Sequence, residues 1–233
     1  MRARFVELAP EGFEEIEQAD AVELVAYGEA GERVRGEFPS AVVTEVQAGW
    51  EDRWREFHRP VRIGPLWIGP PWEQAPAGML GVVIDPGRAF GTGAHATTRL
   101  CVELLLELSP GSLLDVGCGS GVLSIAAARL GFAQVTAVDS DVAAVEAAKA
   151  NAVANGVSLE TRQLDALSGD LPIAETAVAN IALAAVEALA PRLAVDHLIT
   201  SGYLMRDEPA IVGFVHAERR ELDGWAADLY LRA

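Results

Sequence analysis

Residues 113–121 read Leu-Leu-Asp-Val-Gly-Cys-Gly-Ser-Gly, so a carboxylate precedes three glycines at alternate positions. A short apolar run, this turn and the small apolar residues after it predict a strand, a tight turn and a helix. Glycine has no Cβ, so the backbone of the turn can approach a ligand closely. We therefore expect a ligand site at the carboxyl end of this strand. The loop residues expected to line it are Asp115, Gly117, Cys118, Gly119 and Gly121.

The spacing of these glycines distinguishes two kinds of ligand. The dinucleotide fingerprint Gly-x-Gly-x-x-Gly places a pyrophosphate at the helix N-terminus. Here the third glycine comes one residue early, and Asp115 would repel a pyrophosphate but suit a cation. Asp-x-Gly-x-Gly-x-Gly resembles the first motif of the class I methyltransferases, whose ligand, S-adenosylmethionine, carries an ammonium and a sulfonium. An oxidoreductase is therefore disfavoured, as is a turn without a ligand, because each glycine costs conformational entropy.

A second acid ends the next predicted strand, 134–138. Asp139, with Ser140 beside it, lies where an acid takes both ribose hydroxyls of a nucleoside in this kind of sheet. The alternative is that Asp139 caps the following helix, but Ser140 or Asp141 can do that instead. We expect ribose binding.

A third acid follows the predicted strand 157–164. Asp165, next to Ala166, would reach the adenine edge, where its carboxylate can accept from the exocyclic amine. The alternative is an Asx-turn within the loop. Both residues are expected to contact the cofactor.

Asn180 ends the predicted strand 176–180, whose tip faces the transferred methyl group in this kind of fold. Its amide and nearby carbonyls could accept N–H bonds from an amine and aim the lone pair of that amine. Enzymes that methylate base or glutamine amide nitrogens usually carry Asn/Asp-Pro-Pro-Tyr/Phe here, with the aromatic ring stacked on a flat substrate. Residues 180–183 read Asn-Ile-Ala-Leu, so a flat nucleobase is disfavoured.

The segment 85–99, Asp-Pro-Gly-Arg-Ala-Phe-Gly-Thr-Gly-Ala-His-Ala-Thr-Thr-Arg, precedes the predicted sheet. Gly91 and Gly93 would bring backbone and the Thr92 hydroxyl near a ligand. The block therefore predicts a second wall of the ligand site.

His95, in the same block, could be a base or an orienting donor, although a lone histidine at a helix start is more often structural. Thr97 or Thr98 could cap that helix. No other histidine or cysteine has metal-ligand spacing, and no Ser-His-Asp arrangement is suggested, so we expect no metal.

The composition bounds the class of protein. The chain has 233 residues, is 51% hydrophobic and contains only two cysteines, which suggest neither a disulfide framework nor a zinc site. No apolar stretch approaches a membrane span and no signal peptide is evident, so we expect a cytoplasmic protein. The formal charge of −16 argues against a nucleic-acid backbone as partner and is compatible with a basic protein. The alternative is that the acidity only maintains solubility.

Strand-like and helix-like segments alternate from about residue 80. This alternation predicts an α/β fold with a doubly wound, mostly parallel, Rossmann-like sheet of seven strands, closed by a hairpin that turns at Asp223-Gly224. The predicted strands of the sheet are 113–116, 134–138, 157–164, 176–180, 197–200, 218–222 and 226–231, and a further predicted strand, 80–84, precedes them. The predicted helices are 97–108, 122–130, 142–155 and 183–193.

Residues 1–57 differ from the rest and predict a small, acidic α+β domain. Its expected strands are 2–8, 21–27 and 41–47, with a short acidic helix at 12–18 and a helix at 50–57. Residues 58–78 are rich in proline, which blocks helices and central strands, so we expect an extended linker there. The methyltransferase domain would then span 79–233.

The chain resembles the PrmA family, the methyltransferases of ribosomal protein L-eleven, and their protein-lysine methyltransferase relatives. The resemblance covers about residues 50–233. It is carried by the blocks 86–99, 114–123, 138–139, 178–181 and 200–202.

The resemblance implies a methyl transfer from S-adenosylmethionine to amines of a protein, with the N-terminal domain recognising that substrate. It also implies that Phe90, Gly91, Thr92 and Gly93 line the methionine end of the cofactor and the amine entry, and that Asn180 sits beside the methyl group. Thr92, His95 and Asn180 are thus the candidate catalytic residues.

The chain departs from the family pattern at two positions, where Ala94 replaces a histidine and Ala96 an acid. Two other hypotheses therefore stay open: a small-molecule methyltransferase, and a catalytically weak module that binds S-adenosylmethionine.

Overall fold

The computed structural model describes residues 8, 14–18, 21–25, 28–42, 59–85 and 93–233. The chain divides into two compact units, Met1–Arg53 and Trp54–Ala233.

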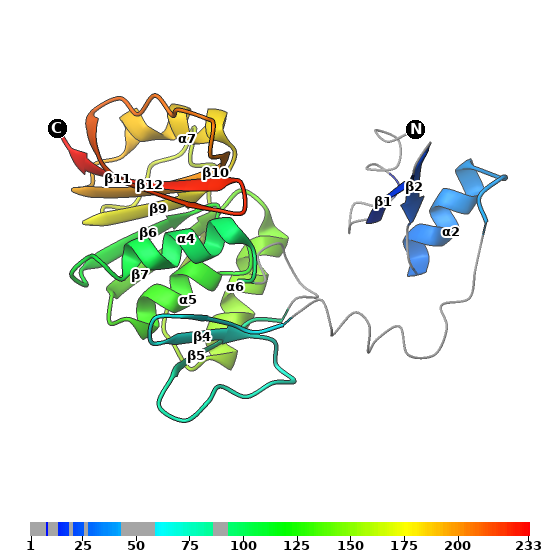
Figure 1. The fold of residues 1–233 in the computed structure, drawn as a ribbon, viewed down its shortest axis with the longest axis horizontal. Coiled ribbons are helices and arrows are strands. Elements are labelled where there is room, and N and C mark those ends of the chain that lie inside the picture. Colours follow the sequence, from blue (N-terminus) through cyan, green and yellow to red (C-terminus); the bar gives the residue numbers. More distant parts are fainter. Residues whose placement is uncertain (1–7, 9–13, 19–20, 26–27, 43–58, 86–92) are drawn as a thin grey trace. The chain divides into compact units, whose positions relative to one another are not determined.

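A seven-stranded sheet organises the second unit, with the order β11-β12-β10-β9-β6-β7-β8 (Figure 1). The strands from β6 to β10 run parallel, while β12 is antiparallel to both of its neighbours. This confirms the predicted fold class. The strands are β6 (Ser112–Val116), β7 (Ala133–Asp139), β8 (Glu160–Gln163), β9 (Thr176–Asn180), β10 (His197–Leu204), β11 (Phe214–Leu222) and β12 (Trp225–Arg232).

The predicted hairpin is confirmed by its turn. Asp223 and Gly224 join β11 to β12 with φ angles of 51° and 81°. Two successive residues of positive φ give a turn whose twist matches that of the strands, and Asp-Gly is a preferred pair for it.

Helices cover both faces of the sheet. Its strands alternate between two cores: Leu113 and Ile199 lie in one cluster, and their chain neighbours Leu114 and Leu198 in the other. This alternation is how one sheet buries both faces. The helices are α4 (Ala96–Leu105), α5 (Val122–Arg129), α6 (Val142–Ala154) and α7 (Leu183–Leu189), which continues as the short 3-10 helix η1 (Ala190–Arg192). No helix in the described ranges is both long and apolar enough to cross a bilayer.

The expected linker 58–78 contains strands, so that expectation is wrong. A separate three-stranded sheet has the order β3-β4-β5, from β3 (Val61–Ile63), β4 (Leu66–Gly69) and β5 (Leu80–Val83). All residues of β4 are buried. Pro65 and Pro70 lie just outside the two ends of β4, where proline removes no ladder hydrogen bond. β5, which corresponds to the predicted strand 80–84, pairs in parallel with β4.

The first unit contains an antiparallel pair, β1 (Glu14–Gln18) and β2 (Ala21–Val25), and a helix, α2 (Gly28–Glu37). The predicted acidic helix at 12–18 is therefore wrong, because pairing across a short connection makes 14–18 a strand. Helix α2 was not predicted; it buries Ala30 and Val34, one turn apart. The predicted strands 2–8 and 41–47 lie mostly, and the helix 50–57 wholly, outside the described residues.

Candidate active site

The glycine-rich loop joins β6 to α5. Gly117, Gly119 and Gly121 have φ angles of 73°, 53° and 79°, in the left-handed region that favours glycine. A Cβ at Gly117 would collide with the side chain of Ile181, and one at Gly121 would lie 2.9 Å from the Cβ of Ala148 on α6. The loop is therefore closely packed on its protein side, and only glycine fits it.

Asp115 is a buried carboxylate directly before this loop. Its side chain accepts hydrogen bonds from the Ser124 N–H, 3.1 Å away, and from the Ser124 hydroxyl, 2.6 Å away. Burial foremost, together with the charge of Asp139, raises the pKa of Asp115 to about 6, although the hydrogen bonds from Ser124 lower it. A cation placed near the two carboxylates would relieve this cost, which is the electrostatic character expected of the site.

Asp139 reaches the glycine-rich loop from the end of β7. Its Oδ2 accepts from the Gly119 N–H at 3.0 Å, and its Oδ1 accepts from the Asp141 N–H at 3.0 Å. The N-cap of α6 is Asp141, whose side chain accepts from the Ala143 N–H. Asp139 therefore does not cap the helix and lies beside the loop. Ser140, which follows it, is exposed.

Asp165 occupies an Asx-turn after β8. Its two carboxylate oxygens accept from the Leu167 N–H at 2.9 Å and from the Ser168 hydroxyl at 2.8 Å. These hydrogen bonds, that from Leu167 foremost, lower the pKa of Asp165. The neighbouring carbonyl of Ala166 accepts from Arg192. The alternative raised from the sequence is thus present, and a contact with adenine stays a prediction for Asp165 and Ala166.

Asn180, Thr97 and His95 form a connected polar chain. The amide of Asn180 donates to the Thr97 hydroxyl at 3.1 Å, and that hydroxyl lies 2.8 Å from the His95 Nδ1. Nδ1 also accepts from the Thr97 N–H, so His95 is the N-cap of α4. An accepting Nδ1 places the imidazole proton on Nε2. The prediction that Thr97 or Thr98 caps this helix is wrong, because both are buried just inside it.

Two further residues shape this end of the sheet. The Trp225 ring meets that of His95 edge-on, with 4.9 Å between the ring centroids. Gly202 in β10 has a φ of 101°, and a Cβ there would collide with the carbonyl of Ile181. Trp225 and the bridging role of Thr97 were missed, because contacts between distant segments leave no local pattern in the sequence.

The predicted residues Phe90, Gly91 and Thr92 lie outside the described residues. Gly93 is described and buried, with a φ of 87°, and a Cβ there would collide with Ile68 of β4. The unexpected small sheet thus packs against the segment that leads into α4.

The order of the sheet explains why these residues lie near one another. β7, β6 and β9 are parallel neighbours, so the glycine-rich loop, Asp139 and Asn180 follow adjacent strand ends. Ligands of open α/β sheets bind at this carboxyl edge. Within the described ranges no group of three potential metal-ligating side chains occurs.

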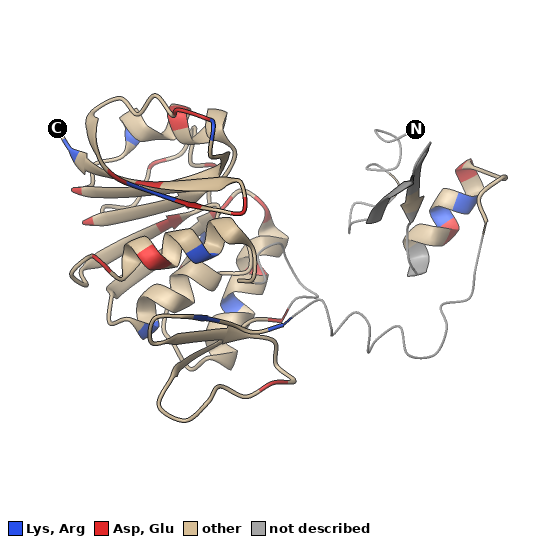
Figure 2. Ribbon diagram, in the orientation of Figure 1, with Lys and Arg blue, Asp and Glu red and all other residues tan. Residues whose placement is uncertain are grey.

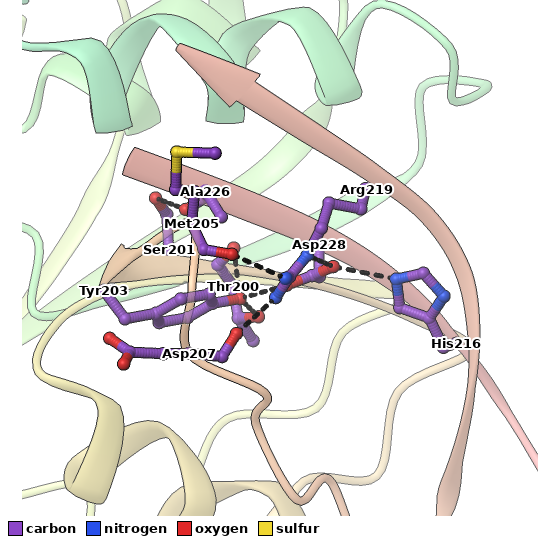
Figure 3. Close-up of polar contacts among 9 residues, drawn as sticks. All are labelled: Thr200, Ser201, Tyr203, Met205, Asp207, His216, Arg219, Ala226 and Asp228. Atoms are coloured by element: carbon purple, nitrogen blue, oxygen red, sulfur yellow. Dashed lines mark hydrogen bonds and ion pairs between the residues drawn. The ribbon is translucent and has the colours of Figure 1, made fainter. Parts of the chain in front are cut away.

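A second buried polar cluster lies on the C-terminal strands (Figure 3). Asp228 receives two hydrogen bonds from Arg219, both 2.9 Å, and others from the Tyr203 hydroxyl and His216. Burial opposes its ionisation, but these hydrogen bonds, with that from Arg219 the strongest, hold the pKa of Asp228 below its usual value. Arg219 also donates to the carbonyls of Met205 and Asp207. This cluster was not predicted.

The sheet order, the antiparallel β12 and the glycine-rich loop after β6 define a class I methyltransferase fold. The sequence model described as "Ribosomal protein L11 methyltransferase (PrmA)" matches residues 13–224, and the chain belongs to this family.

Individual relatives agree with this assignment. The chain is 41% identical over 207 residues to the ribosomal protein L11 methyltransferase of Azotobacter vinelandii, covering 82% of this chain and 70% of that protein. It is 41% identical over 211 residues to that of Geotalea uraniireducens, covering 81% and 65%. The crystal structure of ribosomal protein L11 methylase from Lactobacillus delbrueckii matches with a TM-score of 0.69 and 28% identity, covering 75% of this chain and 99% of that one. The chain thus spans about two thirds of the length of these curated relatives.

Proposed function

We propose that this protein transfers methyl groups from S-adenosylmethionine to amines of a ribosomal protein, namely L11. The support is its membership of the family together with the names of its relatives. The single structural observation that carries the proposal is the polar chain of Asn180, Thr97 and His95 beside the glycine-rich loop.

The residues of the loop fit S-adenosylmethionine. A Cβ at Gly117 would collide with Ile181 and one at Gly121 with Ala148, so only glycine allows this turn at the carboxyl end of β6. Asp115 and Asp139 place two negative charges near a ligand that carries two positive ones. Asp115 would hold the α-ammonium, directly or through water, and Asp139 the ribose hydroxyls. Asp165 and Ala166 would contact adenine. The bound cofactor would supply an electrophilic methyl group on a sulfonium.

The protein's own contribution to the transfer is to bind and orient a neutral amine. A lysine or N-terminal amine must lose its proton before attack, and desolvation near a cation lowers an amine pKa. Positioning then supplies most of the effect, up to roughly 7–11 kcal/mol in well-oriented cases. The Asn180 side chain, set by Thr97, and nearby backbone carbonyls would accept the amine N–H bonds. Thr92 and Phe90 are assigned to this wall by family resemblance.

We assign recognition of the protein substrate to the N-terminal domain, residues 1–57. The chain is strongly acidic, with a formal charge of −16, and acidic positions occur on several elements of the second unit (Figure 2). Such a charge favours encounter with a basic protein. A ribosomal substrate would also place the activity in the cytoplasm.

Two measurements test the proposal in sequence. Calorimetry should show S-adenosylmethionine binding to the parent protein and at least tenfold weaker binding to Asp139→Ala, which loses the ribose acceptor. Incubation with labelled cofactor and purified ribosomal protein L11 should then label lysine or N-terminal amines, located by mass spectrometry. Absence of binding by the parent would refute the cofactor, whereas binding without labelling of L11 would refute the substrate.

A further inference from the structure

Helix α6 contains one buried asparagine, Asn151, and ends at a second, its C-cap residue Asn155. Asn151 and Asn155 are 3% and 7% exposed, in a helix otherwise rich in alanine and valine. Asparagine is a poor residue for a helix interior, and a buried amide is costly unless its hydrogen bonds are made. Both side chains make several. The Asn155 Nδ2 donates to the nearby Asn151 carbonyl at 2.8 Å, and the other partners are backbone groups far away in the sequence.

The two amides hold different segments. Asn155 pairs with the backbone of Val83 in β5: the Val83 N–H donates to its Oδ1 and its Nδ2 donates to the Val83 carbonyl, both at 2.7 Å. Asn151 instead joins two segments. Its Nδ2 donates to the Ser120 carbonyl at 2.9 Å, and its Oδ1 accepts from the Asp85 N–H at 3.3 Å.

Ser120 is fully buried within the glycine-rich loop, between Gly119 and Gly121. The preceding N–H, of Gly119, donates to Asp139, and a Cβ added at Gly121 would lie 2.9 Å from the Cβ of Ala148, one turn before Asn151 on α6. Asn151 therefore holds the loop at the point where the expected ribose acceptor and α6 meet it.

We propose that Asn151 is a positioning residue of the cofactor site. Its amide fixes the Ser120 carbonyl against the end of β5, so that the glycine-rich loop is held in its ligand-binding conformation before the cofactor arrives. This inference rests on the proposed binding of S-adenosylmethionine. A loop that leaves this conformation lowers the apparent affinity in proportion to the fraction of molecules that remain competent.

The substitution Asn151→Asp tests the proposal, because it keeps the shape and the acceptor but places a carboxylate oxygen against the Ser120 carbonyl. Asn155→Asp is the control: it makes the same change at the C-cap of the same helix, against the carbonyls of Val83 and Asn151 and not against the glycine-rich loop. Both variants should unfold at lower urea concentration than the parent. Only Asn151→Asp should weaken S-adenosylmethionine binding by calorimetry, by about tenfold, a change of 1.4 kcal/mol.

Amide hydrogen exchange, measured without cofactor, provides a second test of the positioning role of Asn151. Amides of residues 117–121 should exchange faster in Asn151→Asp than in the parent or in Asn155→Asp. If Asn151→Asp does not fold, Asn151→Ser removes the amide without adding charge and should give the same result.

Three outcomes distinguish a failure of the proposed function from a failure of the positioning role of Asn151. A parent protein that does not bind the cofactor would refute the proposed function. If the parent binds the cofactor and the folded Asn151 variant binds it with the same affinity, only the positioning role of Asn151 is overturned. An equal loss of affinity in Asn155→Asp would also overturn it, since the amides would then act only through the stability of the packing between α6 and β5.

Discussion

The amide of Asn180, at the end of β9, donates a 3.1 Å hydrogen bond to the hydroxyl of Thr97, at the start of α4 and 83 positions earlier in the sequence. The same hydroxyl contacts His95. The Thr97 side chain therefore connects Asn180, which is expected beside the transferred methyl group, to the N-cap of α4. The orientation of the Asn180 amide is thereby set by a residue that itself need not touch the cofactor.

Thr97→Val removes this hydroxyl while keeping the branched shape. We expect kcat to fall by at least tenfold, because the Asn180 amide loses its fixed orientation, while the calorimetric Kd for S-adenosylmethionine changes less than threefold. Thr98→Val, at the neighbouring buried threonine, is the control and should keep most of the activity. Equal losses in the two variants would contradict an orienting role for Thr97.

Gly121→Ala places a methyl group where the φ angle is 79° and the Cβ of Ala148 would be 2.9 Å away. The left-handed conformation alone costs about 1–2 kcal/mol for a residue with a Cβ. We expect a larger loss of stability on urea unfolding, and loss of S-adenosylmethionine binding as the loop shifts. Gly156→Ala is the matched control, since its φ is 62° and a Cβ there meets nothing within 4 Å. It should show the conformational cost alone and bind the cofactor normally.

Because the pKa of Asp115 is raised, we expect the free energy of unfolding to depend on pH. Its pKa is raised from 3.8 to about 6, chiefly by burial, so the folded protein binds this proton more tightly than the unfolded chain does. The resulting stabilisation is fully present below about pH 4 and is lost as the pH rises through about 6. It amounts to about 3 kcal/mol at 1.4 kcal/mol per pKa unit.

The check is to compare the parent with Asp115→Asn by urea unfolding between pH 4 and pH 7.5. The stability of the parent relative to the variant should increase as the pH falls. A constant difference across this range would show that Asp115 titrates alike in the folded and unfolded chains.

Arg219 and Arg220 are adjacent on β11 but differ in the partners that they serve. Arg219 neutralises Asp228, whose side chain is fully buried, whereas Arg220 pairs with the half-exposed carboxylates of Glu103, Glu107 and Glu218. Arg219→Ala should lower the free energy of unfolding by about 3–5 kcal/mol, because a buried charge loses its partner. Arg220→Ala should cost about 1 kcal/mol or less. Equal costs, measured by urea unfolding, would contradict this account.

Prediction from the sequence worked best where local patterns and the sheet rules agree. The bounds of β9 match the predicted strand 176–180, and the Asp223-Gly224 hairpin is confirmed, because a short apolar strand and a two-residue turn are specified by their own residues. The positions of the glycine-rich loop and of Asp139 follow from parallel strands ending at one edge.

The wrong and missed predictions have a common physical cause. Pairing between segments, whether adjacent or distant in the sequence, overrides the structure that each segment would prefer by itself. Residues 14–18 form β1 because they pair with β2, and the proline-rich stretch after residue 58 forms strands because its prolines lie outside the paired positions. Asp228 and Arg219 carry no local signal, since only the register of β11 against β12 brings them together. The N-cap of α4 is His95, because Thr97 and Thr98 lie inside the helix, and the Thr97 hydroxyl accepts from Asn180 of a distant strand.

The place of β12 in the sheet has a consequence for synthesis. β12 follows β11 in the chain, yet it lies between β11 and β10. β11 therefore has no partner in the sheet until the ribosome has extruded β12, which also brings Trp225 and Asp228. The sheet is completed only once β12 has emerged, so a nascent chain that stalls before residue 225 leaves β10 with an unpaired edge that chaperones or proteases can bind.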